Sequence, residues 1–107
     1  MTRLKLDVQP LAVVEMADAL AYYSDISPNL GKQFDEQLDA ALALLCASPG
    51  LGGRRFAHLY RHIDLRCWSL DRFPFRIFYA VHGNSLRVYR VCHERRNITK
   101  ALLRKAK

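Results

Sequence analysis

The stretch SPGLGG, residues 48–53, divides the chain into two parts with different hydrophobic periodicity. Its proline and three glycines form the densest turn signal in the sequence. Before this turn, apolar residues recur mainly every three or four positions, which is typical of helices that pack one face on a core. After it, apolar and polar residues alternate, which is typical of strands. We therefore expect a mainly helical first half and a sheet built largely from the second half.

Two helices are expected ahead of the turn. Pro10 suits the first turn of one helix, and Ser27-Pro28 provides an N-cap and first position for the next. The short break between them predicts an αα-hairpin. The inward-facing residues are predicted to be Val13, Met16, Ala17, Leu20 and Tyr23 in the first helix and Leu30, Phe34, Leu38, Ala41 and Leu45 in the second.

Strands are expected on both sides of the hairpin. Strict alternation from Arg3 to Val8 predicts one strand, and three more follow the turn. The tail 97–107 is compatible with a short helix. The resulting order, β-α-α-β-β-β with a short C-terminal helix, predicts an α+β fold in which the helical hairpin covers one face of a small twisted sheet, antiparallel or mixed, of about four strands. The three later strands are predicted at residues 63–67, 75–81 and 86–92.

Length and composition indicate a single domain over residues 1–107. The three cysteines are far apart and form no C-x-x-C motif, so we expect small core residues rather than a disulfide or a zinc site. No apolar run approaches the roughly 18 residues of a membrane span, and the amino terminus lacks a secretory signal. We expect a cytoplasmic protein that does not contact membranes and needs no cofactor or metal.

The charge is distributed unevenly along the chain. Residues 1–49 carry three Lys or Arg and seven Asp or Glu, a net charge of −4, whereas residues 50–107 carry fourteen and three, a net charge of +11. Eleven of these fourteen cations are arginine, whose planar fork suits phosphate and carboxylate. Because unpaired arginines under the helices would be costly, we expect them on the other face of the sheet. The second half is therefore predicted to meet an anionic partner.

Three stretches in register resemble the RelE/ParE superfamily of bacterial toxins. EMADALAYYSDISPNLGKQFDEQLDAALALLCASPGLG, residues 15–52, resembles its helical hairpin, FPFRIFYAV, residues 73–81, its central strand, and VYRVCHERRN, residues 88–97, its last strand. The resemblance implies the toxin of a type II toxin-antitoxin pair, which is neutralised by a cognate antitoxin in a hetero-oligomer. RelE-like members are metal-independent ribonucleases that cut mRNA on the ribosome, whereas ParE-like members inhibit DNA gyrase by binding it.

The sequence departs from the ribonuclease pattern. RelE-like members place lysines on the strand after the hairpin and an aromatic acid-base residue near the carboxyl terminus, but this chain has no lysine between Lys32 and Lys100 and no aromatic residue after Tyr89. This departure favours a non-catalytic gyrase inhibitor. The alternative is a ribosome-dependent mRNA endoribonuclease, with Arg76 and His93 as its catalytic residues. A third interpretation is a non-toxic family member that serves as a binding module.

Each candidate residue also has a structural interpretation. Arg76 is either a phosphate ligand or a sheet arginine paired with Asp64 or Glu94, and His93 is either an acid-base group or a strand-end histidine. His58 and His62 lack a third metal ligand nearby. The residues predicted to bind the antitoxin or another anionic partner are Arg54, Arg55, Arg66, Arg76, Arg90, Arg95, Arg96 and Tyr22.

Overall fold

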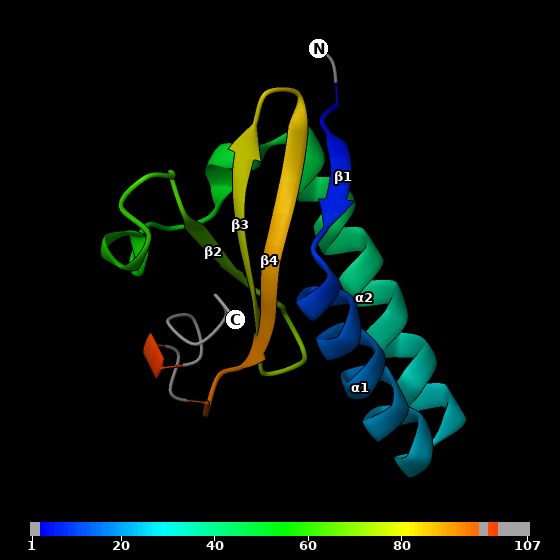
Figure 1. Ribbon diagram of the computed structural model, residues 1–107. Helices are drawn as coiled ribbons and strands as arrows, with labels where there is room; N and C mark the ends of the chain where they lie inside the picture. Colours follow the sequence, from blue (N-terminus) through cyan, green and yellow to red (C-terminus); the bar gives the residue numbers. More distant parts are fainter. Residues whose placement is uncertain (1–2, 97–98, 101–107) are drawn as a thin grey trace.

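The structure, a computed structural model, describes residues 3–96 and 99–100. The helix expected over residues 97–107 lies almost entirely outside the described residues. The order of the remaining elements confirms the predicted β-α-α-β-β-β sequence (Figure 1). The helices and strands are β1 (Lys5–Val8), α1 (Pro10–Ile26), α2 (Pro28–Ala47), β2 (Arg66–Ser69), β3 (Phe75–His82) and β4 (Ser85–His93), with short 3₁₀ turns at Pro49–Leu51 and Ala57–Leu59.

The four strands form one mixed sheet in the order β1-β4-β3-β2. β1 runs parallel to β4, while β3 is antiparallel to both β4 and β2. Both helices pack on one face of this sheet, which we call the helix face (Figure 1). We call the opposite face the loop face. β3 and β4 are joined by a tight turn whose Gly83 has a positive φ of 59°, which glycine adopts without steric cost.

The predicted break between the helices is confirmed at Ser27. Its hydroxyl oxygen accepts a hydrogen bond from the backbone N–H of Leu30 at 3.2 Å, as an N-cap does, and Pro28 follows it as the first residue of α2. Gly31, one turn later, is buried beside Ser24 of α1. The two helices can therefore approach closely at the start of α2.

The main core lies between the helices and the helix face of the sheet. Its most enclosed side chains come from α2 and from the central strands β3 and β4, including Phe34, Ile77 and Val88, which are fully buried. Aromatic rings from α1, α2 and the β2–β3 turn pack edge to face at one end, as in the contact between Tyr23 and Phe73, whose ring centroids are 4.8 Å apart.

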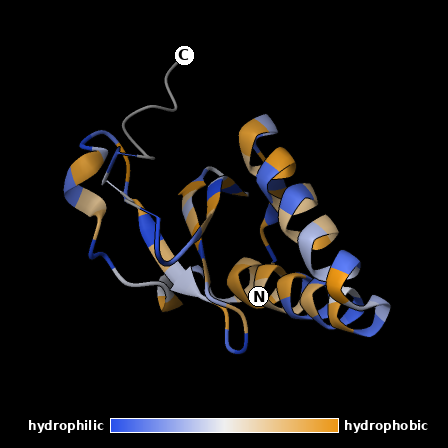
Figure 2. Ribbon diagram, turned by 90° about the horizontal axis from the view of Figure 1, so that it is seen from below, coloured by the Kyte–Doolittle hydropathy of each residue, from blue (hydrophilic) through white to orange (hydrophobic). Residues whose placement is uncertain are grey.

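A smaller core covers part of the loop face. Leu65, Phe78 and Cys92 are buried there under a segment that we call the basic loop, residues 54–63. Figure 2 shows this loop and the two helices on opposite sides of the sheet. The sequence had indicated a cover on the helix face alone. The structure shows that the basic loop covers part of the loop face as well.

The basic loop also explains one wrong strand boundary. The sequence predicted a strand over residues 63–67, but β2 spans Arg66–Ser69. Ile63 and Leu65 pack into or against the small core. Their spacing of two residues resembles the alternating pattern of a strand, although this part of the chain belongs to the loop and its end. Regular pairing with β3 begins at Arg66, which lies opposite Tyr79, and the next residue, Cys67, pairs with Phe78 and also bridges Gly53.

Candidate partner-binding surfaces

A one-residue irregularity in β4 decides which side chains reach each face. Phe78 pairs with Arg90, but the next residue of β3, Tyr79, pairs with Val88, so Tyr89 is an extra residue in β4. Such a bulge reverses the alternation of the bulged strand. Leu86 and Val88 face the main core before it, and Val91 faces the same core after it.

The bulge separates the two residues of the ribonuclease hypothesis. Arg76 pairs across the sheet with Cys92, which packs in the small core on the loop face. His93 pairs with Phe75, a neighbour of the main core, and their ring centroids are 5.2 Å apart. Arg76 and His93 thus point to opposite faces of the sheet, and the structure does not bring them together.

Arg76 itself lies half-buried on the loop face. Within residues 3–96 and 99–100 it forms no ion pair with Asp64 or Glu94, the partners considered from the sequence. Asp64 instead binds Arg54 at 2.7 Å and Arg66 at 3.3 Å. The Arg76 guanidinium therefore remains able to meet an external anion.

Arg66 and Arg55 are held by local contacts. The Arg66 guanidinium donates hydrogen bonds to the carbonyl oxygens of Gly52 at 2.8 Å and Gly50 at 3.3 Å, which ties β2 to the turn after α2. The Arg55 guanidinium lies 5.1 Å from the centroid of the Phe56 ring. Arg55 is exposed, whereas Arg66 is half-buried and serves the fold.

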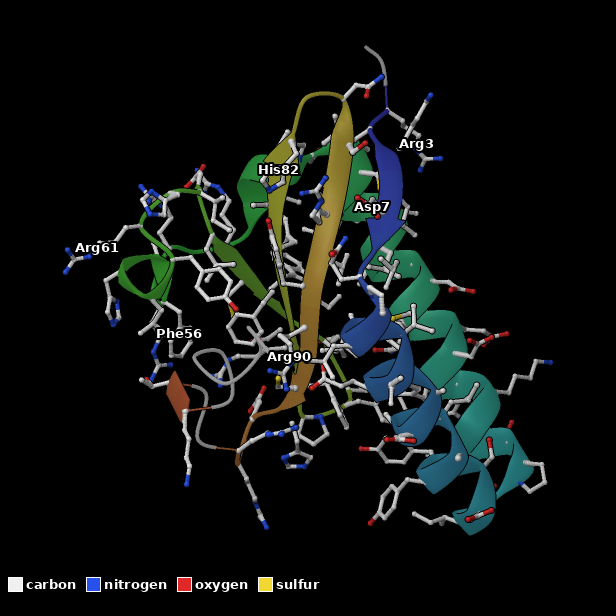
Figure 3. The ribbon with its side chains drawn as sticks, in the orientation of Figure 1. Arg3, Asp7, Phe56, Arg61, His82 and Arg90 are labelled. Carbon is white, nitrogen blue, oxygen red and sulfur yellow. The ribbon has the colours of Figure 1, made fainter. Side chains whose placement is uncertain are left out.

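Arg90 is enclosed rather than exposed. Its residue is only 3% accessible, and its guanidinium contacts the Glu15 carboxylate of α1. Figure 3 labels Arg90 on β4. The hydrogen bond to Glu15 is the main reason that the pKa of Arg90 is raised above its usual value. We therefore exclude Arg90 from the surface that meets a partner, although the sequence had included it.

Arg95 and Arg96 lie exposed in the turn after β4. The backbone N–H of Arg95 donates to Nδ1 of His93 at 3.0 Å, so this ring nitrogen acts as an acceptor. Nη1 of Arg96 lies 3.4 Å from Oε2 of Glu15. His93 thus shapes this turn, and both arginines remain accessible to solvent.

α1 carries a stripe of exposed hydrophobic residues, of which the sequence had indicated only Tyr22. Leu11, Val14, Tyr22 and Ile26 lie on one side of the helix, and each is exposed, Tyr22 by 63% and Ile26 by 59%. The exposed acids Asp18 and Asp25 lie on the same side. The predicted inward stripe is correct for Met16, Leu20 and Tyr23 but wrong for Val13 and Ala17, which are exposed. Because α1 has apolar residues on several sides, its periodicity did not show which of them face the core and which face solvent.

The class of protein follows from this arrangement. A β-α-α-β-β-β chain with a helical hairpin on one face of a mixed sheet is the architecture that the RelE/ParE resemblance implied. A sequence model described as the ParE toxin of type II toxin-antitoxin systems, parDE, matches residues 6–98. The chain belongs to this ParE toxin family. As the toxin of such a system, it has an antitoxin partner.

Comparison with other proteins supports the same fold. A solved structure described as the chromosomal ParDE TA system from P. aeruginosa superimposes with a TM-score of 0.70 at 17% sequence identity, covering 85% of this chain and 96% of that one. No curated protein matches the chain. Neither helix of the described residues combines the length and apolar character that crossing a membrane requires. Residues 3–96 and 99–100 also contain no group of three or more His, Cys, Asp or Glu that would hold a metal.

Proposed function

We propose that this ParE-family toxin acts by binding DNA gyrase and inhibiting it, without cleaving RNA. The observation that carries this choice is the placement of Arg76 and His93 on opposite faces of the sheet. Metal-independent RNA cleavage needs a base, an acid and a phosphate ligand around one phosphodiester. A bulged β4 that separates the two candidate groups does not support that chemistry.

We further propose that the antitoxin covers the stripe on α1. A partner helix or extended segment with apolar side chains would bury Val14, Tyr22 and Ile26, which otherwise expose large hydrophobic area to water. Acidic side chains of the same partner would meet Arg95 and Arg96 beyond the end of β4. Both arginines belong to the second half of the chain, residues 50–107, whose net charge is positive. Arg54, Arg55 and Arg76 form a second group of cations, on the loop face and its rim.

Paired assays of the purified toxin test the proposed target. In the first, gyrase supercoils relaxed plasmid DNA in the presence of increasing toxin; in the second, ribosomes translate an mRNA that is then mapped for cuts. We expect supercoiling to be lost and the mRNA to remain intact. Cuts at codon-defined positions that disappear with His93→Ala would refute the proposal.

The antitoxin surface is tested with charge substitutions in the stripe. Tyr22→Asp and Ile26→Asp should each weaken antitoxin binding by roughly tenfold or more, because burying an unpaired carboxylate in an apolar interface costs more than about 1.4 kcal/mol. Leu51→Asp is the control, since Leu51 is also an exposed large hydrophobic residue but lies in the turn after α2. Equal affinity for all three variants would place the antitoxin elsewhere.

A further inference from the structure

β1 forms one edge of the sheet, and its outer side is not part of the surfaces proposed above. The backbone N–H groups of Lys5 and Gln9 donate to carbonyl oxygens of the neighbouring segment 84–88, at 2.8 and 2.9 Å. Because alternate residues of a strand bond to the same neighbour, the N–H and C=O groups of Leu6 and Val8 point away from β4. Within residues 3–96 and 99–100, no backbone group of a loop or helix bonds to them.

The open part of this edge is short and carries an exposed leucine. Before it, the N–H of Leu4 donates to the carbonyl oxygen of Cys46 at the end of α2, at 3.1 Å, and after it Pro10 begins α1. Leu4 and Val8 pack against the main core, whereas Leu6 between them is 47% exposed. Unpaired backbone groups beside an exposed apolar side chain are the features of a sheet edge that another strand can cover.

The charged side chains of this edge alternate in sign. Lys5 is exposed, and Asp7, which Figure 3 labels on β1, is half-buried. Nε of Arg87 in β4 lies 3.0 Å from Oδ2 of Asp7 and so holds this carboxylate in place. Charges on a sheet edge usually oppose pairing with another strand. Here a lysine and an aspartate flank Leu6, so a second strand of the same sequence that runs in the opposite direction would satisfy both.

We propose that two copies of this chain associate through antiparallel pairing of their β1 strands, about a two-fold axis at Leu6. In this register Leu6 lies opposite the partner's Leu6, Lys5 opposite the partner's Asp7, and Leu4 opposite the partner's Val8. Because the backbone groups of Leu6 point outward, the two leucines exchange both of their backbone hydrogen bonds. The proposal concerns the toxin alone and does not depend on gyrase being its target.

The side chains of the edge select this register over its neighbours. An axis at Lys5 would place two lysines directly opposite each other, and an axis at Asp7 would place two aspartates there, and like charges in these positions are destabilising. An axis between two residues would set Leu6 against a charged side chain. Only the axis at Leu6 makes two pairs of opposite charge. The short edge therefore complements itself, which an unrelated strand does not ensure.

This pairing also keeps the two basic loops apart. It joins two four-stranded sheets edge to edge, in the order β2-β3-β4-β1-β1-β4-β3-β2. Figure 1 shows the basic loop beyond β2, on the opposite side of the sheet from β1. β1 belongs to residues 1–49, whose net charge is −4, whereas the loop belongs to residues 50–107, whose net charge is +11. The two loops lie at the outer ends of the joined sheet, where salt screens their mutual repulsion most.

Charge substitutions test the contact between Lys5 and Asp7. Sedimentation velocity over a roughly hundredfold range of concentration should show a dimer that dissociates on dilution. Lys5→Glu sets like charges opposite each other twice and should weaken this association by about tenfold or more, whereas Lys32→Glu, the same charge change on α2, should not. Asp7→Lys should weaken it as well. An equimolar mixture of Lys5→Glu and Asp7→Lys should associate again, because opposite charges then face each other in both pairs.

A disulfide locates the two-fold axis. Residues that exchange both backbone hydrogen bonds have Cα atoms about 5.5 Å apart, which is within reach of a disulfide. Leu6→Cys should therefore form a covalent dimer under mild oxidation, and faster than Val81→Cys, which is 44% exposed on β3. This readout decides even if Asp7→Lys, which loses its contact with Arg87, fails to fold.

Three results would overturn the proposal. The first is a monomer at every concentration, together with equal rates of crosslinking for Leu6→Cys and Val81→Cys. The second is an equal effect of Lys5→Glu and Lys32→Glu on self-association. The third is a toxin that stays monomeric but binds its antitoxin more weakly after Lys5→Glu, which would assign the edge of β1 to a strand of the antitoxin.

Discussion

The guanidinium of Arg90 and the carboxylate of Glu15 make a two-point contact, with Nε 3.0 Å from Oε1 and Nη2 2.6 Å from Oε2. Oε1 also accepts the backbone N–H of Val91 at 2.9 Å. β1 pairs with β4 only as far as Val88. Beyond that point the Glu15 carboxylate of α1, instead of a strand, accepts a backbone hydrogen bond from the edge of β4. Side-chain exposures of 4% for Arg90 and 11% for Glu15 show that the pair is largely shielded from water.

Replacing Glu15 by Gln should destabilise the fold strongly. The change removes the carboxylate that pairs with the buried Arg90 guanidinium, and breaking a buried ion pair costs roughly 3–5 kcal/mol. Urea denaturation followed by circular dichroism should show a lower midpoint with an unchanged slope. Asp18→Asn, which removes an exposed carboxylate from the same helix, is the control and should change stability by less than about 0.5 kcal/mol.

Removing both partners tests whether the pair is essential. The double variant Glu15→Met, Arg90→Met takes both charges out of the interior, and apolar replacement of a buried ion pair is often neutral or stabilising. We expect it to be more stable than Glu15→Gln alone, although the N–H of Val91 loses its acceptor. A double variant as unstable as the single one would show that the carboxylate matters for the strand edge and not for the arginine.

The phenol of Tyr79 anchors the turn after α2. Its hydroxyl donates to the carbonyl oxygen of Pro49 at 2.6 Å and accepts the backbone N–H of Gly52 at 2.9 Å, and the residue is fully buried. Tyr79→Phe leaves both backbone groups without this partner and should cost roughly 1–3 kcal/mol in denaturant unfolding. Tyr22→Phe, at an exposed position, should have almost no effect; equal losses in the two variants would contradict the anchor.

Much of the fold was predictable because it depends on local signals. Ser27-Pro28 specifies the break between the helices through side-chain capping and a fixed φ, and both effects act within a few residues. The same is true of the turn between β3 and β4, where Gly83 adopts a positive φ. Strand order and the parallel pairing of β1 with β4 depend on residues 80 positions apart, as in Lys5 and Ser85, and periodicity does not encode them.

The candidate site was less predictable, and one residue explains most of the difference. If the alternation of Leu86 and Val88 continued without interruption, Arg90 would lie on the helix face and His93 on the loop face with Arg76. The extra residue Tyr89 shifts the alternation by one, so that Arg90 lies on the loop face and His93 on the helix face. A bulge has no distinct signal in a run rich in strand-forming residues. The sequence also gave no indication that Arg90 pairs with Glu15, which lies 75 residues away.

Gly31 should not tolerate even a methyl group. A Cβ added there would lie 2.9 Å from the backbone Cα of Ser24 and closer still to its hydroxyl oxygen, so α1 and α2 would have to separate. Alanine normally stabilises a helix by up to about 1 kcal/mol relative to glycine. We nevertheless expect Gly31→Ala to destabilise the protein by about 1–3 kcal/mol. Gly50→Ala, where the new Cβ meets nothing within 4 Å, is the control; a stabilised Gly31→Ala variant would contradict the close approach.

Cys67 should react slowly with alkylating reagents even though it is only half-buried. Burial, partly offset by Arg76 and Arg55, raises the pKa of its thiol to about 11, so at pH 8 only about one molecule in a thousand carries the reactive thiolate. Between pH 8 and 9.5 the rate of iodoacetamide alkylation, measured at each cysteine by mass spectrometry, should rise close to tenfold per pH unit. In the unfolded chain, whose thiols titrate near pH 8.5, it should level off.

The same shift has a consequence for stability. A thiol that titrates at higher pH when folded binds its proton more tightly in the native state, so its contribution is intact below the unfolded pKa and declines as the pH rises toward about 11. Cys92, whose pKa burial and Glu15 raise to about 12, acts in the same direction. Cys67→Ser and Cys92→Ala should therefore reduce the loss of stability between pH 8 and 10. A native protein whose Cys67 is alkylated at pH 8 as fast as the unfolded chain would contradict both expectations.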